Sequence, residues 1–214
     1  VEHVDCDEPT GNGARHALRE GNVIRSSLAP VGERESVGAM LARNAARFPD
    51  RPIIREKRGA RFNAITWEDF IYDVVSFGRF LSFHGVSKGD PVAVFSPNRS
   101  ELLVAEFAVM SLGAVYVPIF PGYPAEQARA LAEQTGAKAL VVADAEQLDK
   151  TPIPSTVRLV VSFDPIPRAA IDDALSGREA EYVGFKAALR RGGMSEDVDL
   201  RLKMFLWSAA RVSP

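Results

Sequence analysis

Three short apolar runs, separated by two segments of helical pattern, constrain the fold of this chain more than any other feature. The runs are residues 91–95 (PVAVF), 114–119 (AVYVPI) and 139–142 (ALVV), and turn-forming residues flank each of them. Short apolar runs of this kind suit strands that are buried on both faces of a sheet. The order strand, helix, strand, helix, strand predicts a parallel sheet with right-handed crossovers. We therefore predict an α/β fold built on a half-Rossmann-like βαβαβ unit.

Residues that start and stop helices support the two helices between these runs. Ser100 is placed to cap a helix that Gly113 ends. Pro124 opens the next helix in its first turn, where the missing amide hydrogen costs little, and Gly136 closes that helix. Residues 156–162 (TVRLVVS) then predict a fourth strand.

The sequence before the first apolar run predicts a helix followed by a β-hairpin. Ser36 can cap a helix that Pro49 stops, and apolar residues recur between them at helical spacing. Residues 52–56 and 61–66 are strand-like runs, and Gly59 between them can adopt the positive φ of a tight turn.

A further helix is predicted between Thr66 and Gly85. The Thr66 hydroxyl can cap the free amides, and Asp69 stands where the carboxylate of a capping box would stand. Gly85 ends the helix as a left-handed C-cap. The apolar face of the Thr66 helix contains Phe70, Val74, Phe77 and Leu81. A separate short helix is also predicted around residues 185–191.

Length and composition favour one main folding unit. The chain has 214 residues, of which 46% are hydrophobic and 25% charged, the balance of an ordinary globular protein. Residues 1–34 are polar and lack an apolar period, so we predict a flexible leader without chemistry. Residues 35–214 are predicted to form the α/β subdomain.

Charge and motif content argue against several classes of function. The 26 Lys and Arg residues against 28 Asp and Glu give a net charge of -2, which leaves no broad positive field for a nucleic acid. No apolar run is long enough for a transmembrane segment, and the first residues lack the apolar core of a signal peptide, so we predict a cytoplasmic protein. Cys6 is the sole cysteine, which excludes an intrachain disulfide and a thiolate metal cluster. The histidines His3, His16 and His84 lack any zinc-binding spacing.

Six segments, taken in order, resemble the N-terminal part of the AMP-forming acyl-CoA synthetase and ligase family. Each alone is what a cap, a turn or a buried strand requires, so their order and spacing carry the resemblance, which covers about residues 36–162. Trp67 and residues 144–148 (DAEQL) are more similar to long-chain fatty acyl-CoA synthetases than to peptide-synthetase adenylation domains. The six segments are 44–52 (NAARFPDRP), 65–70 (ITWEDF), 85–94 (GVSKGDPVAV), 112–119 (LGAVYVPI), 122–125 (GYPA) and 135–141 (TGAKALV).

The resemblance implies a two-step reaction. In the family, a carboxylate attacks the α-phosphate of ATP to give an acyl adenylate and pyrophosphate, and the CoA thiol then displaces AMP. This chemistry needs a loop rich in glycine and hydroxyl groups around the phosphates, a Mg²⁺ ion, and a lysine from a C-terminal domain. The family's phosphate loop and its lysine are not found in the 214 residues, and neither are the other glycine-rich phosphate motifs.

The end of the sequence departs from the family pattern. Residues 196–208 (EDVDLRLKMFLWS) resemble the family's approach to the phosphate loop, but the six residues after them (AARVSP) contain no glycine. Side chains obstruct the approach of backbone amides to a triphosphate in such a segment. We therefore expect an incomplete AMP-binding domain that does not adenylate alone. The same expectation implies exposed apolar surface and self-association.

Tyr116 and Phe120 are the candidate substrate-binding residues, and no catalytic or metal-binding residue is predicted. Both lie where a predicted strand leaves the sheet, at the edge where open α/β sheets bind ligands. They can line an acyl tunnel, or they can pack in the core or against another subdomain. The function that the resemblance implies is the N-terminal part of a long-chain fatty acid-CoA ligase, which takes a fatty acid, ATP and CoA. The alternative is a stand-alone, non-catalytic α/β domain that binds a ligand or a protein.

Overall fold

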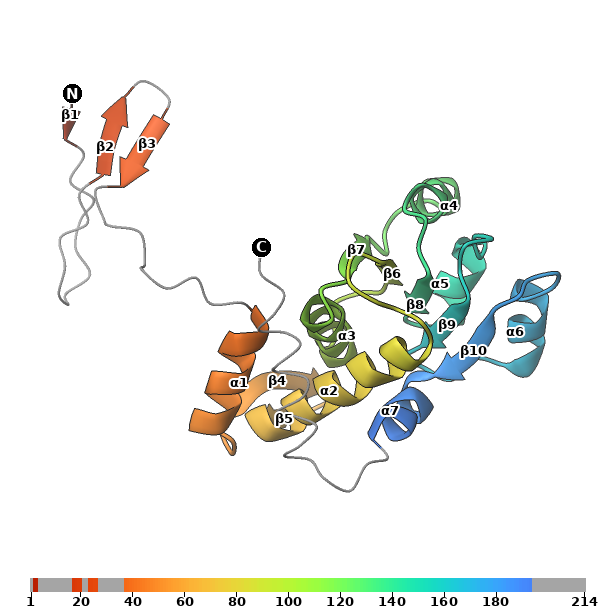
Figure 1. Ribbon diagram of the computed structural model, residues 1–214, viewed down its shortest axis with the longest axis horizontal. Coiled ribbons are helices and arrows are strands. Elements are labelled where there is room, and N and C mark those ends of the chain that lie inside the picture. Colours follow the sequence, from red (N-terminus) through yellow and green to blue (C-terminus); the bar gives the residue numbers. More distant parts are fainter. Residues whose placement is uncertain (1, 4–16, 21–22, 27–36, 194–214) are drawn as a thin grey trace. The chain divides into compact units, whose positions relative to one another are not determined.

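The computed structural model describes residues 2–3, 17–20, 23–26 and 37–193 (Figure 1). The strands are β1 (Glu2–His3), β2 (Ala17–Glu20), β3 (Val23–Ser26), β4 (Pro52–Arg58), β5 (Arg61–Thr66), β6 (Pro91–Phe95), β7 (Val115–Ile119), β8 (Ala139–Val142), β9 (Leu159–Ser162) and β10 (Glu181–Gly184). The helices are α1 (Val37–Arg47), α2 (Trp67–Phe83), α3 (Ser100–Ser111), α4 (Ala125–Gln134), α5 (Ala145–Lys150), α6 (Arg168–Ala174) and α7 (Phe185–Gly193).

The chain divides into two units, Val1–Glu35 and Ser36–Pro214. In the first unit, the strands pair antiparallel in the order β1-β2-β3, within the segment predicted to be a flexible leader. Ser36, Cys6 and residues 196–208 lie outside the described residues. The predicted leader and its boundary stay predictions.

The hairpin and the long helix after it form as the sequence predicts. Gly59 turns the β4–β5 hairpin with a φ of 63°. At the start of α2, the Asp69 amide donates to the Thr66 hydroxyl oxygen at 3.1 Å, and that hydroxyl donates to the Asp69 carboxylate at 2.8 Å. Gly85, with a φ of 83°, follows the end of α2. The predicted apolar face of α2 is fully buried.

A five-stranded parallel sheet forms the centre of the second unit, which confirms the predicted fold class. The strand order is β10-β9-β8-β6-β7, and every neighbouring pair is parallel. The fourth predicted strand begins only at Leu159, because the Val157 amide closes a turn on the Pro154 carbonyl at 3.1 Å. Strand β10 and the short helices α5 and α6 were not predicted. Helix α7 confirms the helix predicted around residues 185–191.

The prediction that residues 114–119 form a strand buried on both faces is wrong. Strand β7 is the edge of the sheet, and Val115 is 47% exposed. The Val115 amide donates to the Asp90 carbonyl, so alternate residues from Val115 onward direct their amides toward β6. Pro118 therefore stands at a position that faces the free edge, where a missing N–H breaks no ladder bond. An edge strand with a proline in this place resists pairing with a further strand.

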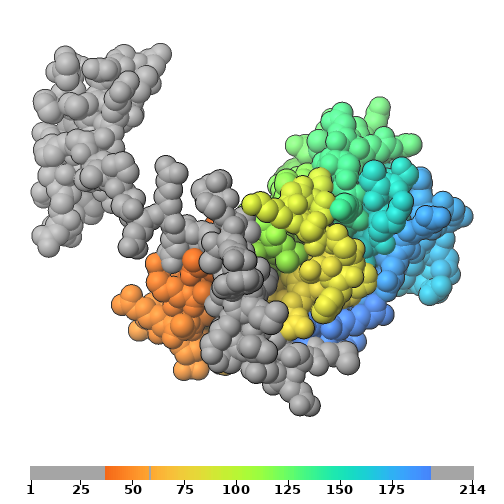
Figure 2. Space-filling view, in the orientation of Figure 1, coloured from red at the N-terminus to blue at the C-terminus, as the bar shows by residue number. Residues whose placement is uncertain are grey.

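Helices cover both faces of the sheet and bury a separate core on each (Figure 1). Residues alternate along strand β6: Val92 and Val94 face the core of α1, α2, α3 and α7, whereas Ala93 and Phe95 face the core of α4, α5 and α6. Figure 2 shows the end of α2 in yellow directly against α7 in blue. Among the described residues, no helix is both long enough and apolar enough to span a bilayer.

Candidate functional site

The carboxyl ends of the parallel strands bring the connecting loops to one edge of the sheet. Ser96 follows β6, Phe120 follows β7, Ala143 follows β8 and Phe163 follows β9. Ligands of open α/β sheets bind outside this edge, where the connections of two neighbouring strands leave toward opposite faces. Strands β6 and β8 are such neighbours here, because α3 belongs to one core and α5 to the other.

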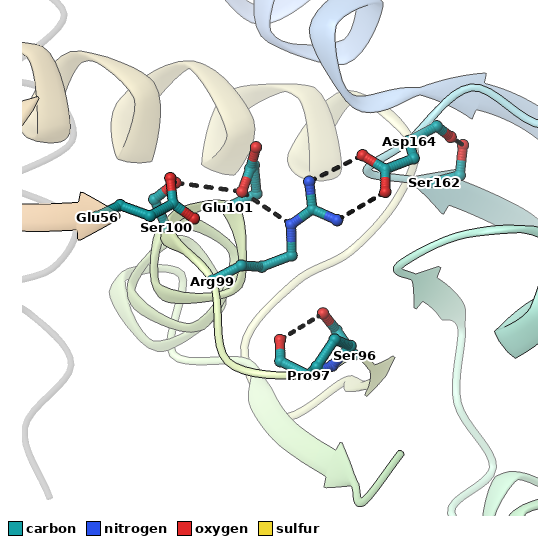
Figure 3. Close-up of polar contacts among 8 residues, drawn as sticks. All are labelled: Glu56, Ser96, Pro97, Arg99, Ser100, Glu101, Ser162 and Asp164. Carbon is teal, nitrogen blue, oxygen red and sulfur yellow. Dashed lines mark hydrogen bonds and ion pairs between the residues drawn. The ribbon is translucent and has the colours of Figure 1, made fainter. Parts of the chain in front are cut away.

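Arg99 occupies the centre of this edge (Figure 3). Its Nη1 and Nη2 donate to the two carboxylate oxygens of Asp164 at 2.9 and 2.8 Å, and its Nε donates to Glu101 at 2.9 Å. The guanidinium also lies over the Phe163 ring, 5.4 Å from its centroid. Because Arg99 follows β6 and Asp164 follows β9, the ion pair spans the end of β8, which lies between those strands.

Charge pairing decides the protonation of this cluster. Burial raises the pKa of Glu101, but the hydrogen bond from Arg99, a backbone hydrogen bond and the Arg99 charge outweigh burial and lower that pKa to about 2. The Asp164 and Glu101 hydrogen bonds raise the pKa of Arg99 above its ordinary value. Arg99 and Glu101 are therefore both ionised near neutral pH.

Ser100 does not cap α3, contrary to the prediction. It is the first residue of the helix, and the capping position falls on Arg99, which makes no side-chain cap bond. The Ser100 hydroxyl instead donates to the carboxylates of Glu56 and Glu101, at 3.3 and 3.2 Å. Arg99 has an extended backbone with a φ of -161°, so the helix begins one residue earlier than predicted, and Ser100 ties α3 to strand β4.

A pocket of about 390 Å³ lies between β4 and the start of α3. Its volume falls in the range of small-molecule sites. Ile54, Leu102 and Leu103 supply apolar walls, and the Arg99 cluster borders it. The lining residues are Ile54, Arg55, Glu56, Asn98, Arg99, Ser100, Leu102 and Leu103.

The structure places the two candidate substrate residues in different surroundings. Tyr116 is partly buried against the core that contains α2 and α3, and burial, followed by the charge of Glu106, raises its pKa to about 12. Phe120 is 64% exposed, and its ring packs edge to face on Tyr123 with centroids 5.6 Å apart. Their assignment to substrate binding stays a prediction. Phe120 offers an accessible apolar surface, whereas Tyr116 acts mainly in packing.

Sequence reasoning missed the Arg99 cluster because its members are far apart in the chain. Arg99 and Asp164 are separated by 65 positions, and no local motif links them. One signal was present: each charged residue follows closely after a short apolar run of the kind that forms a buried parallel strand. Such positions meet at the carboxyl edge of a parallel sheet.

Within residues 37–193 and the three short strands, no group of three or more His, Cys, Asp and Glu side chains is placed to hold a metal ion. The carboxylates nearest the ligand edge already pair with Arg99. We therefore derive no chemical step through a metal or nucleotide on these residues.

Comparison with known proteins gives the family. A family model described as AMP-binding enzyme matches residues 41–193. Enterobactin synthase component F of Escherichia coli O157:H7 is 27% identical over 141 residues, 66% of this chain and 11% of that protein. The 3-hydroxypropionyl-coenzyme A synthetase of Sulfurisphaera tokodaii is 31% identical over 102 residues, 48% of this chain and 16% of that protein.

A solved structure shows the same fold. The A domain of carboxylic acid reductase from Segniliparus rugosus, in complex with AMP and a co-purified carboxylic acid, superposes with a TM-score of 0.65 at 18% identity. The match covers 77% of this chain and 31% of that one. The chain thus spans less than a third of the length of each of these three proteins. Because the family model matches most of the chain, across the whole parallel sheet, this protein belongs to the AMP-binding enzyme family.

Proposed function

We propose that this chain supplies the N-terminal α/β subdomain of an enzyme that activates a carboxylic acid as an acyl adenylate. The observation that carries the proposal is the family match over residues 41–193, which extends from α1 to the end of α7. The names of the relatives support carboxylic acids as the substrate class, because they include coenzyme A synthetases and a carboxylic acid reductase domain. In the complete enzyme, ATP, Mg²⁺ and CoA are the expected reactants.

Within that class, we propose a long-chain fatty acid as the substrate. The support is the sequence resemblance at Trp67 and residues 144–148, together with the exposed Phe120–Tyr123 pair at the ligand edge of the sheet. Two aromatic rings at such an edge provide apolar contact for an alkyl chain. Polar acids of the same length gain nothing from that surface.

A binding experiment tests the long-chain substrate independently of the family assignment. We expect dodecanoate, but not acetate, to shift NMR signals of Phe120 and Tyr123 in a saturable manner, and Phe120→Ser to weaken this response. Phe83→Ser is the matched control, because Phe83 is 69% exposed at the end of α2, and the next residue, His84, contacts Glu181 at the start of β10, at the opposite end of the sheet. An equal response to acetate and dodecanoate contradicts the long-chain proposal and leaves the family assignment intact.

We further propose that the 214 residues alone do not form an adenylate. The support is the sequence, which contains no glycine-rich phosphate loop. The expected result is no exchange of pyrophosphate into ATP with acetate, 3-hydroxypropionate or dodecanoate. Exchange above a no-enzyme control refutes this proposal.

A stand-alone, non-catalytic α/β domain that binds a ligand or a protein is the second candidate, and the pocket of about 390 Å³ between β4 and α3 is the observation that favours it. The coding sequence that follows the codon of Pro214 distinguishes the enzyme subdomain from the stand-alone domain. A following segment with a glycine-rich loop and a distal lysine supports the enzyme subdomain. A native stop codon, together with a stable monomer, supports the stand-alone domain.

A further inference from the structure

An open α/β sheet ordinarily takes a ligand outside the carboxyl ends of two neighbouring strands whose connections leave toward opposite faces, and β6 and β8 are such strands here. Backbone hydrogen bonds continue the sheet across this edge. The Ala143 amide donates to the Phe95 carbonyl at 3.0 Å, and the Asp164 amide donates to the Ala143 carbonyl at 2.8 Å. These bonds place Asp164 just beyond the end of β9, where its carboxylate faces Arg99 (Figure 3).

Arg99 is oriented by groups other than Asp164. Glu101 accepts from its Nε, and the Phe163 ring lies beneath the guanidinium. Both contacts leave the Nη1–Nη2 end of the guanidinium pointing at Asp164. That end forms the two parallel bonds with which arginine binds carboxylates and phosphates alike.

The exposed fractions of Arg99 and Asp164 indicate which of the two a ligand could replace more easily. The Arg99 side chain is 18% exposed, whereas the Asp164 side chain is 48% exposed. The Arg99 guanidinium is thus mostly buried at the edge of the sheet, whereas the Asp164 carboxylate lies on its solvent side. The N-terminus of α3, which follows Arg99 directly and lacks a side-chain cap, adds a partial positive charge at the same place.

We propose that Arg99 forms the core of an oxyanion site at this edge of the sheet and that Asp164 is its resident anion. Asp164 closes the site to phosphate groups in the native chain. Removal of the Asp164 carboxylate opens the site to inorganic phosphate or to the phosphate of a nucleotide. The inference does not depend on the proposed adenylate chemistry, because its test needs no enzymatic activity.

The test compares Asp164→Asn with the native chain in a titration with inorganic phosphate at constant ionic strength. The readouts are the Arg99 Nε–H signal by NMR and the midpoint of thermal unfolding. We expect Asp164→Asn to bind phosphate at least about tenfold more tightly than the native chain, because a bidentate charge-assisted contact becomes available. The double variant Arg99→Gln/Asp164→Asn should lose this gain.

Asp172→Asn is the matched control for the change in net charge. Asp172 pairs with Arg168 on the exposed surface of α6 at 2.9 Å. A phosphate response of Asp164→Asn that equals that of Asp172→Asn overturns the proposal. Asp164→Ser provides a second variant without the amide. Failure of both Asp164 variants to fold also overturns the proposal, because Asp164 is then an indispensable structural group rather than a replaceable anion.

A parallel titration with AMP identifies the source of the phosphate group. Tighter binding of AMP than of inorganic phosphate to Asp164→Asn supports a site for a nucleotide phosphate. Equal binding supports a site for free phosphate. Both results support the oxyanion site, provided that the Arg99→Gln/Asp164→Asn variant loses the response.

Discussion

Gly192 of α7 lies against the backbone of Ser76 in α2 so closely that a Cβ atom at Gly192 would stand 1.8 Å from the Ser76 carbonyl oxygen. The neighbouring atoms are backbone, which cannot move aside as a flexible side chain can. The close approach of the two helices therefore depends on the absence of a side chain at this position.

Gly192→Ala should force α7 away from α2 and lower the free energy of unfolding by about 1–3 kcal/mol. Denaturant unfolding followed by circular dichroism measures the change. Gly184→Ala is the control, because a Cβ at Gly184 meets no atom within 4 Å. Equal stability of the two variants would show that the helices can separate without cost.

Asp73 of α2 should lower stability near neutral pH. Burial, followed by the charges of Asp69 and Glu101, raises its pKa from 3.8 to about 6. The folded state therefore binds more protons than the unfolded state between these values, so the contribution of Asp73 to stability falls as the pH rises from 3.8 to 6. At pH values above 6, Asp73→Asn should raise the midpoint of unfolding relative to the native chain. This gain should shrink as the pH falls toward 3.8. The exposed Asp149→Asn variant is the control; a gain independent of pH contradicts the assignment.

Glu101, in contrast to Asp73, should raise stability near neutral pH. Although burial raises its pKa, the bonds from Arg99 and the backbone and the Arg99 charge lower it from 4.5 to about 2 in the folded chain. Its stabilisation is thus present above pH 4.5 and is lost as the pH falls toward 2. Glu101→Gln should destabilise the chain near neutral pH, and its deficit should diminish below pH 4.5. Equilibrium unfolding across this pH range tests the sign, and a deficit that grows in acid is the contrary result.

Substitution of Tyr116 should lower the free energy of unfolding more than substitution of Phe120. Tyr116→Ala removes a partly buried ring from the core and should cost about 1–3 kcal/mol of unfolding free energy. Phe120→Ala removes an exposed ring and should change stability by no more than about 0.5 kcal/mol. A large cost at Phe120 would assign it to packing and argue against its role in binding an acyl chain.

The sequence predicts the parallel sheet well because its central strands are short, apolar and bounded by turns. It does not show which strand is at the edge: the run at 114–119 is as apolar as the others, and only the strand order leaves Val115 exposed. Strand β10 was missed because Glu181 and Gly184 interrupt the apolar pattern.

The candidate site was less predictable than the fold. Ser100 has the residue type of a helix cap, yet the helix begins at Ser100 itself, and its hydroxyl donates to two carboxylates. One of these, Glu56, is 44 positions distant, so local pattern gives no sign of it. The Arg99–Asp164 pair likewise depends on the strand order. Long-range polar pairs of this kind follow from topology, which must be known first.

Titration of the 214-residue chain with ATP in the presence of Mg²⁺, followed by calorimetry, tests the central claim most directly. A full-length family member with demonstrated pyrophosphate exchange serves as the positive control. Because the chain offers no glycine-rich backbone segment for a triphosphate, we predict no saturable heat of binding. Saturable binding of one ATP per chain would contradict the account and require a nucleotide site on residues that we assign to the scaffold.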